Sequence, residues 1–227
     1  MYGDAISSGI VGYQQITVPN GYSLFTVTFK NVGGGDYDAQ DIKPDTDTNG
    51  KIYIQKLEAS GEYANNTYNW RANKSGWCKS LALQDRGVIT FTDGEGMVVN
   101  NTTGSEVVFQ VSGEVVLQPW TGLCPVGYTL IGNMTPVEID AQDIIPYLAD
   151  ASGVSETNGK IYIQKLETSG EYADNTYNWR YNKNGWCKSL SLQGRGVITF
   201  KPGEAAVLNN TTESPIKLKL PSPVSSN

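Results

Sequence analysis

The side chains that could carry out acid–base chemistry in this sequence are carboxylates, because its 227 residues include no histidine. Histidine is the commonest general base and metal ligand, so catalytic triads and zinc sites built on it are excluded. The enzymatic arrangement that remains is a pair of carboxylates about 5 to 9.5 Å apart in a cleft, as in glycosidases. We expect no enzyme, with a carboxylate glycosidase as the weakest alternative, because no repeated acid stands in a catalytic motif. The repeated acids are Asp38 and Asp140, Asp41 and Asp143, Glu58 and Glu167, Glu62 and Glu171, and Glu95 and Glu204.

A second group of oxygen ligands lies between Asp45 and Gly50, in the sequence Asp-Thr-Asp-Thr-Asn-Gly. Asp45, Asp47 and Asn49 match the first, third and fifth ligands of a calcium-binding loop, and the turn glycine follows them. The twelfth position of such a loop needs a bidentate Glu and holds a lysine here, and the second copy of the segment has Val154 in place of Asp45. The sequence therefore favours a solvated turn and no cofactor. A weak calcium site is the alternative.

Aromatic side chains gather between residues 63 and 77 and again between residues 172 and 186, interleaved with amide and basic side chains. A sugar-binding surface uses flat rings beside such donors, because the rings stack on the sugar while the polar groups bind its hydroxyls. The competing interpretation places the same rings in the core, where Tyr and Trp serve as large residues with one polar edge. The candidate ligand-binding residues are Tyr68, Trp70, Arg71, Trp77, Tyr177, Trp179, Arg180 and Trp186.

The two aromatic segments are copies of one another, because the chain is an internal duplication. Residues 51–103 match residues 160–212 without a gap, with 42 identities in 53 positions and an offset of 109. The similarity continues upstream, and its gaps fall in stretches expected to be surface loops. We expect two modules, residues 1–112 and 113–227, which pack against each other because no flexible linker joins them.

Short antiparallel strands are expected to carry these residues. Alternation of apolar and polar residues, enrichment in β-branched and aromatic types and turn signals such as Asn49-Gly50 predict strands and no long helix. A single helical turn is expected at residues 38–42, capped by Asp38. The fold class is therefore all-β, with two tandem, similar antiparallel β-sandwich or small β-barrel domains. The strands expected in the first module span residues 10–18, 22–29, 51–57, 67–71, 87–92, 96–100 and 106–111.

Charge and composition narrow the range of partners. The formal net charge is −6 and the basic residues form no stripe, which argues against nucleic acid as a partner. The sequence contains no run of 18 apolar residues, so it predicts no membrane span. The Asn-, Thr-, Gly- and Tyr-rich composition favours a secreted or cell-surface location, although the N-terminus lacks the pattern of a signal peptide.

Three cysteines, Cys78, Cys124 and Cys187, cannot all pair within one chain. Cys78 and Cys187 are equivalent in the repeat, so a disulfide between them requires a local twofold axis that brings their Cα atoms within about 7 Å. Reduced, buried thiols are the favoured interpretation.

Two short sequence patterns lie near the start and the end of the modules. The opening pattern is Gly127-Tyr-Thr-Leu-Ile-Gly-Asn-Met-Thr-Pro136. The closing pattern occurs twice, as Phe91-Thr-Asp-Gly-Glu-Gly-Met-Val-Val-Asn100 and as Phe200-Lys-Pro-Gly-Glu-Ala-Ala-Val-Leu-Asn209. They resemble the "G-[WY]-N-L-I-x-N-P" opening strand and the "L-x-P-G-E-G-[FY]-x-V-x-N" closing strand of secreted bacterial β-modules of unknown function. The second copy departs from that pattern at Ala205 and Ala206, and the first has Met97. The resemblance implies an extracellular, accessory, non-catalytic part of a bacterial protein and carries over no functional residue.

The sequence thus favours a non-catalytic extracellular or cell-surface bacterial protein that acts as a binding or adhesion module, with a glycan or a surface protein as its partner. Two copies of one binding surface would raise the avidity for a repeated target. The alternative is a purely structural surface or assembly subunit, in which the duplication replaces a homodimer and the aromatic rings pack inside. Exposure of the tryptophans separates these functions, because interior rings cannot stack on a ligand.

Overall fold

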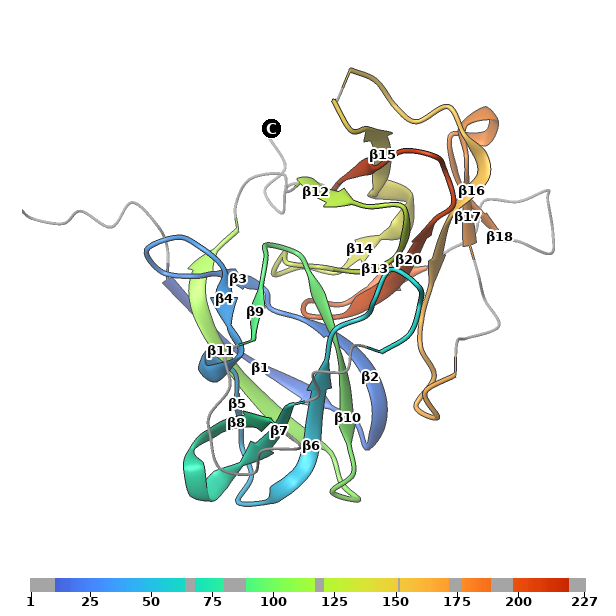
Figure 1. Cartoon of the computed structure of the whole chain (residues 1–227). Coiled ribbons are helices and arrows are strands. Elements are labelled where there is room, and N and C mark those ends of the chain that lie inside the picture. Colours follow the sequence, from blue (N-terminus) through green and yellow to red (C-terminus); the bar gives the residue numbers. More distant parts are fainter. Residues whose placement is uncertain are drawn as a thin grey trace, which may run out of the picture.

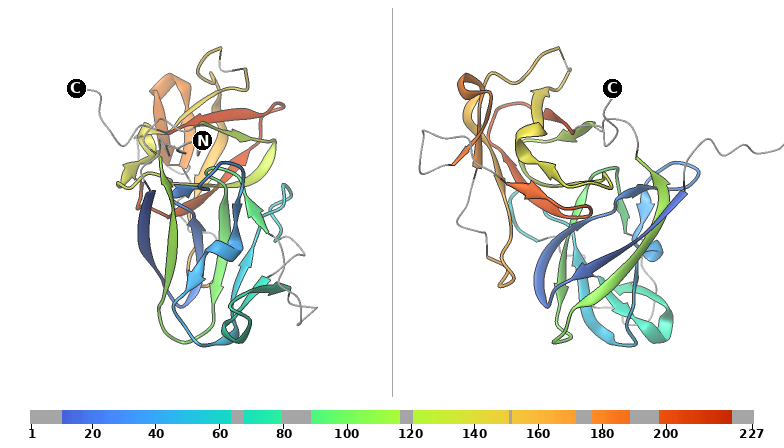
Figure 2. Two further views of the ribbon diagram at one scale, coloured as in Figure 1. Left: turned by 90° about the vertical axis from the view of Figure 1, so that its left-hand side faces the viewer. Right: turned by 180° about the vertical axis from the view of Figure 1, so that it is seen from behind.

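The computed structural model describes residues 11–63, 68–79, 89–116, 121–150, 152–171, 177–188 and 198–220. The described residues form antiparallel sheets joined by turns, and their helices are single 3-10 turns. The all-β, sandwich-like fold predicted from the sequence is confirmed. No helix in the described ranges has the length and hydropathy needed to cross a membrane. Figures 1 and 2 show two similar modules stacked on one another, the first coloured blue to green and the second yellow to red.

The first module forms a five-stranded sheet and a smaller sheet that faces it, with one further strand pair. The five-stranded sheet has the order β2-β10-β6-β7-β8, and the smaller sheet has β1-β11-β3 with β5 also paired to β11. The strands are β1 (Val11–Val18), β2 (Gly21–Thr26), β3 (Phe29–Lys30), β4 (Tyr37–Asp38), β5 (Lys43–Pro44), β6 (Asn49–Gln55), β7 (Tyr68–Arg71), β8 (Gly76–Lys79), β9 (Thr90–Phe91), β10 (Gly96–Asn101) and β11 (Val107–Val115).

The second module repeats this topology, with a five-stranded sheet β13-β20-β16-β17-β18 and a smaller sheet β12-β21-β15. Its strands are β12 (Thr121–Cys124), β13 (Gly127–Gly132), β14 (Ile139–Asp140), β15 (Ile145–Leu148), β16 (Asn158–Gln164), β17 (Tyr177–Arg180), β18 (Gly185–Lys188), β19 (Thr199–Phe200), β20 (Ala205–Asn210) and β21 (Ile216–Lys219). The 3-10 turns are η1 (Ala39–Asp41), η2 (Ala72–Lys74), η3 (Ala141–Asp143) and η4 (Tyr181–Lys183).

Each module has its own core between its two sheets, and β6 shows how the sequence builds it. Ile52 and Ile54 are fully buried while the residues between and beside them are exposed or half-buried. This alternation is the one predicted from the sequence, since successive side chains of a strand point to opposite faces. The two cores are separate clusters, one containing Ile52, Ile54 and Phe109 and the other Ile161 and Ile163.

β10 and β20 are apolar on both faces. Met97 and Val99 face the core of the first module, whereas Val98 belongs to a third cluster that includes residues of both modules. A strand buried on both faces shows a continuous apolar run rather than an alternating one. The five-stranded sheets of the two modules therefore pack against each other, and contacts between β10 and β13 and between β2 and β20 join them.

The boundary between the modules lies later than predicted. β11 runs through residues 112 and 113, and its pairing with β1 extends to Val11 opposite Glu114. The expected boundary at 112/113 would cut this strand, so the first module continues through β11. Ser112-Gly-Glu-Val115 is similar in sequence to Ser8-Gly-Ile-Val11, and this similarity places a boundary inside β11. Strand pairing decides the boundary.

The predicted helical turn at residues 38–42 is confirmed as η1. The Asp38 carboxylate accepts a hydrogen bond from Gln40 N at 2.9 Å, and Asp140 makes the same bond to Gln142 N at 2.9 Å. These carboxylates cap the first turn by bonding otherwise unpaired N–H groups. The predicted strand at residues 87–92 lies partly outside the described residues, and its described part is β9.

Candidate functional site

The aromatic rings singled out in the sequence lie inside the two modules. β7 and β8 place Trp70 against Trp77, with ring centroids 5.6 Å apart and planes 64° apart, and β17 and β18 repeat this pair at 5.7 Å and 64°. Trp77 Nε1 donates to Ile42 O at 2.9 Å, so the inner indole is hydrogen-bonded inside the core. The Gln40 side chain bonds both backbone groups of Trp77, at 2.8 and 3.0 Å.

Burial corrects the sequence-based assignment of a sugar-stacking site. A ring needs an exposed face to stack on a ligand, and these rings belong to the cores that the competing interpretation predicted. The exposed fractions are 4% for Tyr68 and Tyr177, 6% for Trp70, 1% for Trp179, and 0% for Trp77 and Trp186. Arg71 and Arg180 are half-buried at the ends of β7 and β17.

Polar atoms without partners lie beside both arginines. Arg71 Nε and Asn69 Oδ1 are buried with no hydrogen-bond partner among the described residues, and Arg180 and Asn178 repeat this arrangement. The pairing of β6 with β7 shifts register in this region, between Asn49 and Tyr53. A buried site with an unpaired donor and an unpaired acceptor suits an ordered water molecule. The same unpaired atoms occur in both modules, so this buried polar site belongs to the shared module fold.

The residues considered for calcium form part of a turn. Asp45, Asp47 and Asn49 are all exposed, and Asn49 Oδ1 accepts a hydrogen bond from Asn73 N at 3.1 Å. In the second module Asn158 Oδ1 accepts the equivalent hydrogen bond from Asn182 N at 3.1 Å, although that module lacks the first carboxylate. Within the described ranges no three His, Cys, Asp or Glu side chains come close enough together to hold a metal ion. Because both modules share this asparagine contact, the Asn-Gly sequence is accounted for by the structure of the turn, without a metal ion.

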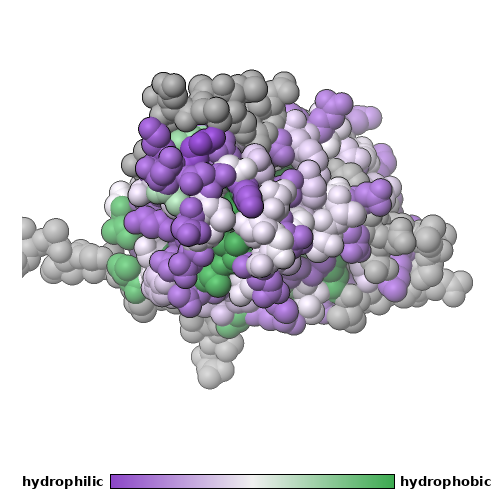
Figure 3. Space-filling model, turned by 90° about the horizontal axis from the view of Figure 1, so that it is seen from below, coloured by the Kyte–Doolittle hydropathy of each residue, from purple (hydrophilic) through white to green (hydrophobic). Residues whose placement is uncertain are grey.

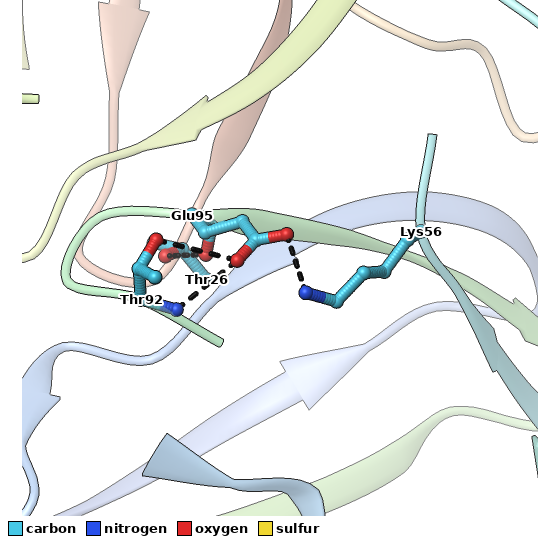
Figure 4. A network of polar contacts seen from close by, with 4 residues as sticks. All are labelled: Thr26, Lys56, Thr92 and Glu95. Atoms are coloured by element: carbon cyan, nitrogen blue, oxygen red, sulfur yellow. Dashed lines mark hydrogen bonds and ion pairs between the residues drawn. The ribbon is translucent and has the colours of Figure 1, made fainter. Parts of the chain in front are cut away.

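Glu95 stabilises a turn, and it is the Glu of the sequence that resembles the closing strand of bacterial β-modules. Figure 4 shows its carboxylate between Thr92 and Lys56. Oε2 accepts from Thr92 N at 3.0 Å, and Oε1 lies 2.7 Å from Lys56 Nζ. Glu204 repeats both contacts, at 3.0 Å from Lys201 N and 2.5 Å from Lys165 Nζ. These acids orient the turn before β10 and β20.

The modules meet through backbone contacts that occur twice. Tyr22 N donates to Thr168 O at 2.8 Å, and the equivalent Tyr128 N donates to Ala59 O at 2.9 Å. A Cβ at Gly21, which has φ 92°, would overlap Thr168 O, so this close approach requires glycine. An interface in which the same surface is used on both sides is isologous, the arrangement of a twofold dimer. The single chain thus contains a pseudo-twofold interface.

A second symmetric pair of bonds lies closer to the axis. Thr26 N donates to Gly203 O at 2.9 Å, and the equivalent Gly132 N donates to Gly94 O at 3.0 Å. The side chains at this pair are not equivalent, because a Cβ on Gly132 would overlap the Thr26 side chain. Thr26 therefore fills a space that its counterpart leaves empty.

An apolar cluster covers the rest of the interface. Its buried members come from β2, β10, β13 and β20, and they are Leu24, Val98, Leu130, Ala205 and Val207. Sequence reasoning predicted that the modules pack together but did not identify these residues. The available signals were the continuous apolar runs at residues 97–99 and 205–208 and the repeated Tyr and Leu of β2 and β13.

A groove of about 650 Å³ lies where the two modules meet beside β1 and β2. Both strands are at sheet edges, and they line the groove with consecutive residues, which is how a strand edge borders a space. The lining includes residues 14–19 and 22–25 from the first module and residues 165, 166, 168, 199 and 201–205 from the second. Both modules contribute to its lining, which mixes amide, hydroxyl and ammonium groups with apolar side chains.

The three thiols are free and buried, as expected from the sequence. Burial raises the pKa of the Cys124 thiol from 9.0 to about 12. A thiolate is the reactive form of cysteine, so this thiol is inert at neutral pH. Cys78 and Cys187 lie in β8 and β18, inside their own modules.

Figure 3 shows the end of the first module from below, where the coloured surface is mostly hydrophilic or intermediate in hydropathy and apolar residues form small separate patches. Comparisons with known proteins found no matching family, no matching curated protein and no matching solved structure.

Proposed function

We propose that this chain is a non-catalytic structural module of a bacterial surface or secreted assembly, in which the duplication replaces a homodimer. The observation that carries the proposal is the isologous interface, with the same backbone contacts made once in each direction. A closed pseudo-twofold unit has one fixed geometry, because each module buries the apolar face of the other. Such a unit suits a spacer or a building block.

The side chains available for other activities support this proposal. The tryptophans that would stack on a sugar are in the cores, and Asp38 and Glu95 are engaged in caps and turns. Asp140 and Glu204 make the same contacts in the second module. Repeated side chains that stabilise local structure need no further activity to account for their presence.

Acrylamide quenching of tryptophan fluorescence in the presence of a polysaccharide panel tests this role. The Trp120→Phe variant is used as background, because Trp120 lies outside the described residues and the other four tryptophans are buried. We expect weak quenching that no polysaccharide changes. Strong quenching that a polysaccharide protects against would overturn the structural role and restore the sugar-binding one.

A second role, binding of a glycan between the modules, is favoured by the groove beside β1 and β2. Its lining includes Gln15, Ser23 and Lys201, whose amide, hydroxyl and ammonium groups can bind sugar hydroxyls. Calorimetric titration with the same polysaccharides tests this role, with Ser23→Trp as the variant that fills the groove. Binding that Ser23→Trp abolishes would support the groove, and an absence of heat for every polysaccharide would exclude the glycans tested.

A further inference from the structure

The two modules differ at one indole N–H. Trp179 Nε1 donates to Ser155 O at 2.9 Å, whereas Trp70 Nε1 is buried with no acceptor among the described residues. The two indoles pack edge-to-face on their inner partners with the same geometry, 5.6 Å and 64° for Trp70 and 5.7 Å and 64° for Trp179. The rings therefore have the same orientation, and the difference lies in what stands in front of them.

A loop of different length stands there. Eight residues separate Ile42 from Lys51 in the first module, and fifteen separate Ile144 from Lys160 in the second. The longer loop folds back along β15, with Leu148 N donating to Gly153 O at 2.9 Å and a bridge between Tyr147 and Val154.

This returning segment fills the space in front of Trp179. Ser155 N donates to Pro146 O at 2.8 Å, and Ser155 is only 2% exposed. Val154 packs against the core of the second module. The segment thus supplies a carbonyl to the indole and an apolar side chain to the core, and it lies alongside β15 as an added strand would.

The first module has a pocket of about 550 Å³ at the corresponding place. Trp70 lines it, together with Pro44 of β5, Asp45 and Gln110. β5 pairs with β11 and stands in the position that β15 has in the second module. The pocket lies beside β5, where the first module lacks residues that correspond to most of the longer loop.

We propose that this pocket binds a short extended peptide of a partner protein, which lies along β5 and accepts a hydrogen bond from Trp70 Nε1 through a backbone carbonyl. In the second module Gly153 and Val154, which have no counterparts in the first, lie back along β15, so a further peptide segment fits beside this strand. A buried N–H without an acceptor costs free energy that an incoming carbonyl recovers. Addition of a strand to a sheet edge is a common mode of peptide recognition.

The rest of the lining agrees with a peptide. Lys43, Asp41 and Asp45 bring charges of both signs, and Gln110 adds an amide that can both donate and accept. This mixture suits the alternating donors and acceptors of a peptide better than a ligand of a single charge.

Binding requires the loop at residues 45–48 to move outward, because Thr46 occupies the place that Ser155 has in the second module. The loop is held at its ends, where Asp45 N donates to Val108 O at 2.8 Å and Ala72 N donates to Thr48 O at 3.2 Å. Between them, Thr46 N donates to Pro44 O at 3.0 Å, the bond that Ser155 makes in the second module. The incoming peptide replaces this bond with its own.

The test uses the full chain and a synthetic peptide with the sequence of residues 147–157, the second module's own loop. Indole-labelled protein is titrated with the peptide and followed by NMR. We expect the Trp70 Nε1–H resonance, assigned with Trp70→Phe, to shift and saturate at one peptide per chain. Trp70→Phe should weaken binding roughly tenfold, the loss expected for one buried hydrogen bond. Trp179→Phe is the matched control and should leave the affinity unchanged.

A loop graft tests the pocket without removing a core ring. Replacement of Asp45 by residues 147–154 gives the first module the longer loop, which should fill the pocket, abolish peptide binding and raise the Tm. The proposal is overturned if no indole resonance shifts at millimolar peptide, if a scrambled peptide binds equally, or if the grafted chain still binds. These outcomes are independent of the proposed structural role, because they report on the pocket alone.

Discussion

Asn101 and Asn210 each tie a loop to the end of a closing strand. Asn101 is fully buried, and its Nδ2 donates to Pro19 O at 3.1 Å and to Ser105 O at 2.8 Å. Its Oδ1 accepts from Thr103 N at 3.0 Å and from Thr103 Oγ1 at 2.7 Å. The Asn101-Thr102-Thr103 sequence is therefore a structural motif with a buried asparagine, in which both ends of the amide are satisfied.

We expect Asn101→Ala to lower the free energy of unfolding by about 2–3 kcal/mol, because it leaves buried carbonyls without donors. Chemical denaturation followed by far-UV circular dichroism measures the loss. Asn73→Ala, at an exposed site, is the control and should change stability by less than about 0.5 kcal/mol. A loss no larger than that of the control would show that water satisfies these carbonyls.

Cys124 makes stability fall at alkaline pH. Burial raises its pKa to about 12, above the 9.0 of the exposed thiol, so the folded state holds a proton that the unfolded state loses between these values. The stabilising effect is complete below pH 9 and disappears as the pH rises toward 12, by about 1.4 kcal/mol per pH unit at most. Tyr37, whose pKa burial also raises to about 12, adds to the loss above pH 10.

Urea denaturation of the wild type and of Cys124→Ala at pH 8, 9, 10 and 11 measures this effect. The wild type should lose more stability than the variant between pH 9 and pH 11, because the variant lacks the thiol. Parallel curves for the two proteins over this range would contradict the burial of the thiol.

At the scale of elements, the side chains that meet across the pseudo-twofold axis are complementary rather than identical. Thr26 on β2 faces Gly132 on β13, and Gly96 on β10 faces Ala205 on β20. A Cβ added to Gly96 would lie 2.9 Å from the Ala205 Cβ. In each pair a residue with a side chain thus faces a glycine. In a symmetric dimer both sides must carry the same residue, so only a fused chain can use this complementarity.

Exchange of the first pair tests this complementarity. Gly132→Thr should destabilise the chain by about 1–3 kcal/mol, because the new side chain overlaps Thr26. Addition of Thr26→Gly should recover at least half of that loss, since the threonine then occupies the opposite side of the axis. Thermal unfolding of the two single variants and the double variant gives the coupling. Thr17→Gly, at an exposed site on β1, is the control partner and should give additive losses.

The sequence predicted most elements, because alternation in β6 and turn signals report local structure. It did not predict which face of the Trp70 and Trp77 strands is buried, since the same aromatic types serve cores and binding surfaces. The boundary at 112/113 failed because a one-dimensional match does not reveal that β11 continues its pairing with β1. The unpaired Trp70 N–H could not be predicted either, because it depends on how two loops of different length are placed beside equivalent indoles.

At the scale of the whole molecule, the stacked modules shown in Figure 2 should unfold together. Leu24 is 8% exposed and packs with residues of both modules, so each module's outer sheet face is covered only while the other is folded. Separation of the modules would expose this apolar cluster to water, which links the stability of one to that of the other.

Calorimetry of the wild type should therefore show one transition whose van't Hoff and calorimetric enthalpies agree. Leu24→Asp places a charge in the interface, and we expect it to split the transition into two while each module keeps its own core. Leu123→Asp adds the same charge at a site 63% exposed and should retain the single transition. A single transition in Leu24→Asp would mean that the modules are coupled through the backbone bonds of β2 and β13 alone. Two transitions in the wild type would instead make the modules independent units, and the fused-dimer interpretation would fail.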